Sequence, residues 1–108
     1  MTILEGDSSK PEPFAIRLQI PAGTQIAAHW HPGLEHVTVI SGTFHIGLGD
    51  KLDTMKGITL PPGSFMVLPP KTNHYAWAEE DCVIQLHGVS PWGLHYVNPA
   101  EDPSNTKS

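Results

Sequence analysis

The sequence predicts an all-β protein built as an antiparallel sandwich or barrel. Glycine and proline account for 10 and 11 of the 108 residues. They interrupt the chain about every ten positions, which leaves room for short strands but not for long helices. No stretch shows the apolar spacing of an amphipathic helix, and no segment repeats another. The length suits one domain, residues 1–108.

The expected strands are rich in β-branched and aromatic residues and are bounded by turn residues. Residues 1–12 are expected to form a polar, loosely tethered arm, 13–97 the barrel, and 98–108 a polar tail. Within the barrel the expected strands are 13–20, 26–31, 35–41, 43–48, 57–60, 65–69, 73–78, 82–88 and 92–97.

Strands 35–41 and 43–48 are expected to form a hairpin around Ser41-Gly42. In that register one face carries Glu35, Val37, Val39, Phe44, Ile46 and Leu48, and the other carries His36, Thr38, Ile40, Thr43 and His45. The first set is apolar apart from Glu35 and is expected to face the core. A carboxylate at the end of such a row is costly without a partner, and a cation is a suitable one.

Composition argues against several classes of function. Lys plus Arg number 6 against 11 Asp plus Glu, a net charge of −5, and the basic residues are scattered, so nucleic acid is not an expected partner. The single cysteine, Cys82, cannot form an internal disulfide. No apolar run approaches the ~20 residues of a membrane span, and the start does not resemble a signal peptide. We therefore expect no membrane partner and a cytoplasmic location.

The segment AHWHPGLEH concentrates side chains that bind metals. His29 and His31 are spaced i, i+2, so both rings project from one face of an extended strand and can take adjacent positions around one ion. Glu35 follows the bend expected at Pro32-Gly33 and can add an oxygen ligand. A fourth ligand must come from elsewhere, and His74, at the start of a later strand, is the candidate.

These spacings resemble the two sequence motifs of the cupin superfamily. The first motif is matched throughout by Gly23, His29, His31, Glu35 and Gly42, separated by five, one, three and six residues. The second is matched by Gly63, Pro69 and His74. Two positions depart from it, because Lys71 stands where the motif has glycine and Ala78 where it has asparagine.

The resemblance implies an antiparallel double-stranded β-helix, or jelly-roll barrel, usually in a homodimer. It also implies one divalent transition metal held by His29, His31, Glu35 and His74. Three imidazoles and one carboxylate suit Fe, Mn, Co, Ni, Cu or Zn, and four protein ligands leave two positions of an octahedral ion open. The alternative is that these histidines are polar edge and turn residues that bind no metal.

Gln85 and His87 share one face of strand 82–88, opposite Ile84 and Leu86. One interpretation makes them a solvent-facing pair, and the other makes them hydrogen-bonding residues of a pocket near the metal. They are the only nearby candidates for a general base in the sequence.

The function that the sequence favours is a small metal-dependent enzyme that binds an oxygen-bearing small molecule in the barrel. Oxygenase is the first reaction class, and isomerase or lyase comes next. The alternative is a non-enzymatic, metal-loaded module that binds or senses a small molecule. A third interpretation makes the metal only a structural support for the fold.

Overall fold

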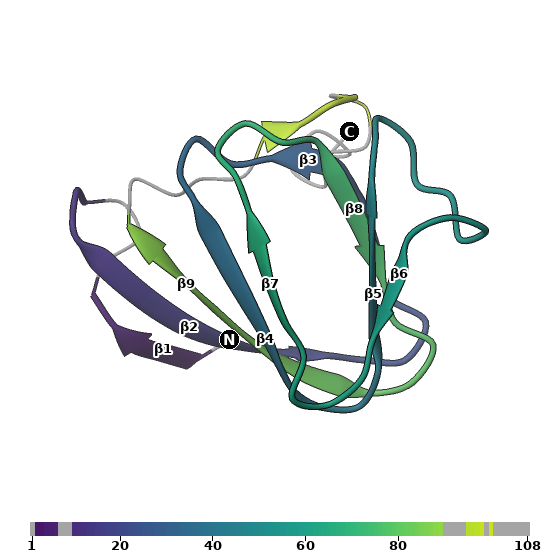
Figure 1. Ribbon diagram of the computed structural model, residues 1–108, viewed down its shortest axis with the longest axis horizontal. Coiled ribbons are helices and arrows are strands. Elements are labelled where there is room, and N and C mark those ends of the chain that lie inside the picture. Colours follow the sequence, from purple (N-terminus) through teal and green to yellow (C-terminus); the bar gives the residue numbers. More distant parts are fainter. Residues whose placement is uncertain (1, 7–9, 90–94, 99, 101–108) are drawn as a thin grey trace.

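The computed structural model of the protein describes residues 2–6, 10–89, 95–98 and 100 (Figure 1). In this part of the chain every regular element is a strand. The strands are β1 (Thr2–Glu5), β2 (Pro13–Ile20), β3 (Gln25–Trp30), β4 (Glu35–Ser41), β5 (Phe44–Leu48), β6 (Ile58–Leu60), β7 (Phe65–Leu68), β8 (His74–Trp77), β9 (Cys82–Val89) and β10 (His95–Tyr96). Over the described ranges there is no helix with the length and apolar character to cross a bilayer.

The strands form two five-stranded antiparallel sheets that face each other (Figure 1). Sheet A has the order β1-β2-β9-β4-β7, and sheet B has the order β10-β3-β8-β5-β6. Apart from β1 with β2 and β5 with β6, neighbouring strands are not consecutive in sequence, as in β2 with β9 and β3 with β8, because the chain repeatedly crosses from one sheet to the other. The expected all-β, double-stranded β-helix architecture is confirmed.

The main core fills the space between the sheets, since alternate residues of each strand point inward. Its buried members are Phe14, Ile16, Ile20, Val37, Val39, Phe44, Ile46, Leu60, Leu68, Ala76, Ala78, Cys82, Ile84 and Leu86. A smaller cluster of Ala28, Tyr75 and Trp77 packs with Leu52 and Val97. Tyr75 is fixed there because its hydroxyl donates a hydrogen bond to the carbonyl of Asp53 at 3.1 Å.

Most expected strands lie within one or two residues of the observed ones, and the exceptions are at the two ends. Residues 1–12 do not form only a loose arm, because Thr2–Glu5 is β1 and pairs with β2, with Ile3 opposite Ile16. The C-terminal strand is seen as His95–Tyr96, and 92–94 lie outside the described residues. The expected tail is also outside them, except for residues 98 and 100.

The hairpin expected around Ser41-Gly42 is wrong, because β4 pairs with β7 and β9 whereas β5 pairs with β6 and β8. A two-residue hairpin loop of the favoured kind needs a positive φ at its first central residue. Here only Gly42 is left-handed, with φ 74°, so the chain turns a corner from sheet A into sheet B. The expected faces still hold with one exception, Leu48, whose side chain is 62% exposed.

Candidate metal centre and family

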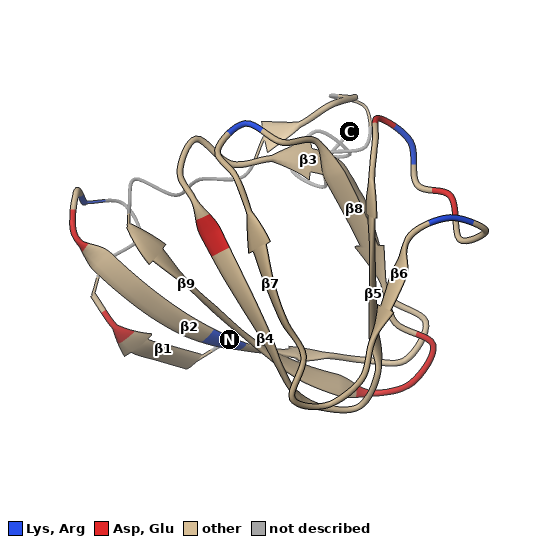
Figure 2. Cartoon of the chain, in the orientation of Figure 1, with Lys and Arg blue, Asp and Glu red and all other residues tan. Residues whose placement is uncertain are grey.

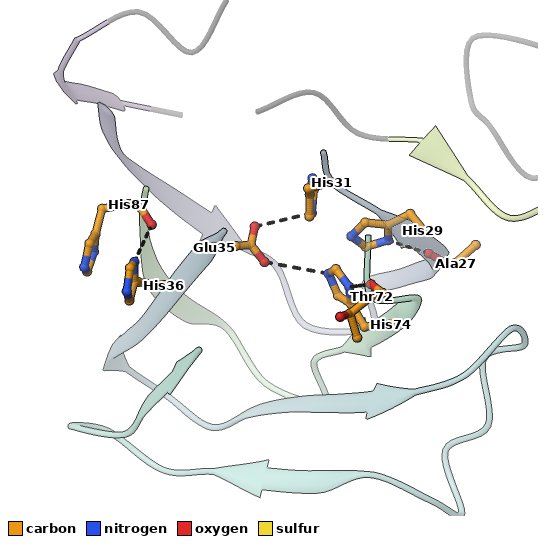
Figure 3. A network of polar contacts seen from close by, with 8 residues as sticks. All are labelled: Ala27, His29, His31, Glu35, His36, Thr72, His74 and His87. Carbon is orange, nitrogen blue, oxygen red and sulfur yellow. Dashed lines mark hydrogen bonds and ion pairs between the residues drawn. The ribbon is translucent and has the colours of Figure 1, made fainter. Parts of the chain in front are cut away.

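Three separate segments bring His29, His31, Glu35 and His74 together at one end of the barrel (Figure 3). His29 lies near the end of β3, opposite His74 at the start of β8. Glu35 is the first residue of β4 and reaches the cluster from the other sheet. All four side chains are buried, with 3–5% of their surface exposed.

The side-chain distances suit donors that share one ion. The Nε2 atoms of His31 and His74 lie 3.4 and 3.7 Å from the two carboxylate oxygens of Glu35. Ligand atoms of His29, His31 and His74 lie within 4.8 Å of one another. Two donors bound at about 2.1 Å to the same ion are roughly 3.0–3.4 Å apart when they are neighbours in its coordination sphere. A charge-assisted hydrogen bond would be shorter, about 2.7–2.9 Å.

Backbone carbonyls select the tautomer that a metal ligand needs. Nδ1 of His29 lies 2.7 Å from the carbonyl oxygen of Ala27, and Nδ1 of His74 lies 2.9 Å from that of Thr72. Because a carbonyl can only accept, each Nδ1 carries the proton. The lone pair of the neutral ring is then on Nε2, which is the arrangement found in metal-binding histidines.

The surroundings also keep these rings neutral. Burial and the nearby His74 lower the pKa of His29 to about 4, although its hydrogen bond to Ala27 opposes the change. Burial likewise lowers the pKa of His74. Near neutral pH both rings are therefore unprotonated and able to donate a lone pair. The donor set, the tautomers and the charge state all fit a divalent transition metal.

The turn before β8 holds the ligand segments in register. The backbone N–H of Lys71 donates to the carbonyl of His31 at 2.8 Å, which ties the turn to the segment that follows β3. Lys71 has φ 59°, the only left-handed non-glycine residue in the described ranges. This explains why the related motif has glycine at that position, since a lysine adopts this conformation only at some cost. The departure from the motif therefore leaves the turn intact.

A cavity of about 80 Å³ adjoins the four donors, between the two sheets. Besides those donors, the residues that line it are Leu18, Ile26, Val37, Phe44, Ile46, Leu68, Ala76, Ile84 and Leu86. The side chains that the structure describes in this wall are all hydrocarbon. A cluster of polar donors at one end and an apolar wall elsewhere are typical of a small-molecule site.

Gln85 and His87 do not line this cavity, so their interpretation as pocket residues near the metal is wrong. Their neighbours Ile84 and Leu86 point inward, and strand alternation turns Gln85 and His87 to the outer face of sheet A. There the Arg17 guanidinium donates to Oε1 of Gln85 at 2.9 Å. The His87 ring stacks on that of His36, with ring centroids 4.7 Å apart, on the far side of β4 from the metal cluster (Figure 3).

Other parts of the centre carry no sequence signal. The carbonyls of Ala27 and Thr72 are backbone groups, which any residue supplies. Tyr96 pairs with His29 through β10 and its ring lies 5.9 Å from the imidazole. The match to the two motifs ends at residue 78, so only the strand pairing shows that Tyr96 neighbours the site.

Several solved structures share this fold. A conserved protein with a double-stranded β-helix domain from Klebsiella pneumoniae is 20% identical, with a TM-score of 0.66 over 86% of this chain and 80% of that chain. Salicylate 1,2-dioxygenase from Pseudoaminobacter salicylatoxidans, solved with gentisate, is 18% identical, with a TM-score of 0.64 over 73% and 20%. The DMSP lyase DddQ from Ruegeria pomeroyi is 17% identical, with a TM-score of 0.63 over 76% and 40%.

Identities this low establish the fold alone. Among curated proteins, none matches this sequence. The family comparison is more specific, because the model of the cupin domain family Cupin_2 matches residues 16–87. That span holds all four clustered donors and both motifs. The chain belongs to the Cupin_2 family of cupin domains.

Proposed function

We propose that this cupin is a mononuclear metal enzyme that acts on a small oxygen-bearing molecule. His29, His31, Glu35 and His74 would hold one divalent transition metal, and the adjoining cavity would hold the substrate. The observation that carries this proposal is the convergence of four buried donors from three segments. A buried carboxylate is costly in its ionised form unless a cation lies beside it, and a metal bound by the three histidines would supply that cation.

Each part of the site has a distinct task. The carbonyls of Ala27 and Thr72 hold the rings of His29 and His74 with Nε2 toward the centre. Glu35 contributes negative charge that offsets part of the charge of a divalent ion. The hydrocarbon wall excludes water and strengthens the electrostatic contacts inside the cavity. A bound metal would supply Lewis acidity toward a substrate oxygen and, if it is iron, redox chemistry with dioxygen.

The cavity wall favours oxygenase over isomerase or lyase. Proton abstraction needs a general base within hydrogen-bond reach of the substrate. Among the described residues that line the cavity, only the four donors carry a side-chain nitrogen or oxygen. Oxidation by dioxygen at a metal places less demand on such a base. Both classes occur among proteins of this fold, as the dioxygenase and the lyase illustrate.

The metal proposal is tested by elemental analysis of protein purified without added metal. We expect about one transition metal per chain, and iron would support the oxygenase class. His74→Ala removes one donor. Loss of a residue that only hydrogen-bonds to a metal ligand lowers metal affinity roughly 10–100-fold, so loss of the ligand itself should lower it further. The matched control is His36→Ala, which removes a histidine from the outer face. Equal metal content in both variants would show that the ligand set is wrong.

The catalytic proposal needs an open coordination position. We expect the metal-loaded protein to bind a small oxygen ligand and to show exchangeable water at the metal by relaxation measurements. A metal with no exchangeable water and no affinity for such a ligand would contradict catalysis at this site, even if metal binding itself were confirmed.

The second candidate function is a metal-loaded binding or sensing module. The same lack of further acid or base groups in the described cavity wall supports it. A ligand that binds tightly and is recovered unchanged after prolonged incubation in air would favour this function. Consumption of dioxygen together with the ligand would favour the enzyme.

The cytoplasmic location and the homodimer stay predictions.

A further inference from the structure

The polar and apolar side chains that line the cavity beside the metal centre are segregated. Its polar side chains are those of the four clustered donors, all at one end. The remaining wall consists of aliphatic side chains and the ring of Phe44. The backbone groups of the strands around it are engaged in the antiparallel pairing of the two sheets. Among the described residues, a molecule in this cavity therefore finds polar partners at one end only.

The volume limits the size of such a molecule. A cavity of about 80 Å³ is well below the roughly 300–1,000 Å³ of pockets for drug-sized ligands. The four donors are part of its lining, so a bound metal and the ligand atoms on it would share this space. The length left for the rest of the ligand is therefore short.

We propose that the natural ligand has an oxygen-donor head group and a short, uncharged apolar tail that fills this cavity. The inference rests on the proposed metal site and adds the class of substrate to it. The head group would bind the metal through one or two oxygens. The tail would gain affinity from burial against Leu68, Ala76 and Ile84, among others.

The same wall selects against polar tails. A hydroxyl or carboxylate placed among these side chains would lose its water and find no hydrogen-bond partner in the described wall. Such a ligand should bind roughly tenfold or more weakly than its apolar analogue. Sugars, amino acids and dicarboxylic acids are therefore poor candidates, whereas short alkyl compounds with a single oxygen-rich end are good ones.

The test uses Co²⁺-loaded protein and straight-chain alkyl hydroxamic acids, whose head group chelates metals. Binding is followed by the visible absorption of Co²⁺, with metal content checked after each titration. We expect affinity to rise about fourfold with each of the first added methylenes, and to stop rising once the tail fills the cavity. Succinic monohydroxamic acid, which ends in a carboxylate, should bind at least tenfold more weakly than butanohydroxamic acid.

Two variants locate the effect. Ile84→Ala enlarges the cavity and should move the optimum to a longer tail. Val83→Ala is the matched control on the same strand, because residue 83 alternates to the other face of β9, and it should leave the optimum unchanged. Ala76→Leu fills the cavity and should reduce the affinity for butanohydroxamic acid toward that for acetohydroxamic acid.

The outcomes separate this inference from the proposed function. Affinity that does not depend on tail length, or an optimum that does not move in Ile84→Ala, overturns the apolar tail while leaving the metal site standing. Equal or tighter binding of the carboxylate analogue does the same. Failure of the protein to take up Co²⁺ overturns the metal site and the inference together.

Discussion

The buried position of His29 determines how the metal-free protein responds to acid. In the folded chain its pKa is lowered to about 4, and burial lowers that of His74 as well. In the unfolded chain an ordinary histidine has a pKa of about 6.5. Between these values the unfolded state binds more protons, so stability rises with pH and is lost as pH falls from about 6.5 to 4.

We expect His29 to account for roughly 3 kcal/mol of this loss in the free energy of unfolding. The measurement is urea denaturation of metal-free protein from pH 7.5 to 4.5. His29→Gln serves as the control, because glutamine does not titrate and carboxylates elsewhere affect both proteins equally. The difference in stability between the two proteins should shrink toward low pH. A difference that is constant with pH would contradict a buried, neutral His29.

At the level of elements, the corner between β4 and β5 depends on Gly42. Its φ of 74° is left-handed, and a Cβ on it would overlap the carbonyl oxygen of Asp81 and the side chain of Cys82. Gly23 also has a left-handed φ, 86°, but has open space where a Cβ would stand. The two glycines therefore separate the cost of conformation from the cost of crowding.

We expect Gly42→Ala to destabilise the protein by about 3 kcal/mol or more, since strain and overlap add. Gly23→Ala should cost only about 1 kcal/mol, because conformation is its only penalty. Chemical denaturation of both variants gives the comparison. Equal losses would mean that the neighbours of Gly42 relax and that the corner is not tightly packed.

At the scale of the whole molecule, the core should keep the protein folded without metal. Its buried apolar residues come from both sheets, and half of them do not line the cavity beside the four donors. We expect chelation to leave the far-ultraviolet circular dichroism spectrum unchanged. Thermal unfolding should remain cooperative, with a lower midpoint because the stabilisation that bound metal provides is lost. That stabilisation is about 4 kcal/mol when the metal concentration is roughly a thousand times its Kd. Loss of structure on chelation would instead support a purely structural metal.

The outer face of sheet A is the surface best suited to a homodimer. The outward side chains of β4, β7 and β9 include His36, Thr38, Phe65, Val67, Gln85 and His87, none of which is Asp, Glu, Lys or Arg. Figure 2 shows acidic and basic residues on β1, β2, β4 and the loops. The acidic residue of β4 is Glu35, which is buried. Two copies of net charge −5 would repel least through this face.

We predict a dimer through this face, with twice the 11.7 kDa mass of the chain in sedimentation experiments. Phe65 is 57% exposed on the edge strand β7, and Phe65→Asp should give monomers. Met55→Asp is the control, since Met55 is 91% exposed in the loop between β5 and β6. A monomeric wild-type protein, or a dimer that survives Phe65→Asp, would contradict this interface.

The sequence by itself determined the fold class, most strand positions and the four clustered side chains. It did so because these depend on local periodicity and on fixed spacings, such as His29 and His31 on one face of a strand. Glu35 at the end of the apolar row that includes Val37 and Val39 was also correctly placed. Strand alternation placed His29, His31 and Glu35, which does not depend on the neighbouring strand. The jelly-roll fold and the place of His74 in the cluster instead came from the resemblance to the cupin motifs.

Tertiary structure decided everything that depends on which strands are neighbours. Ser41-Gly42 turns a corner and does not close a hairpin, because the φ values of the turn send β5 into the other sheet. Gln85 and His87 belong to the outer face because β9 lies between β2 and β4 with Ile84 and Leu86 inward. The cavity, with its size and apolar wall, exists only once residues from both sheets meet. A sequence specifies each side chain, but a cavity is defined by side chains that are distant along the chain.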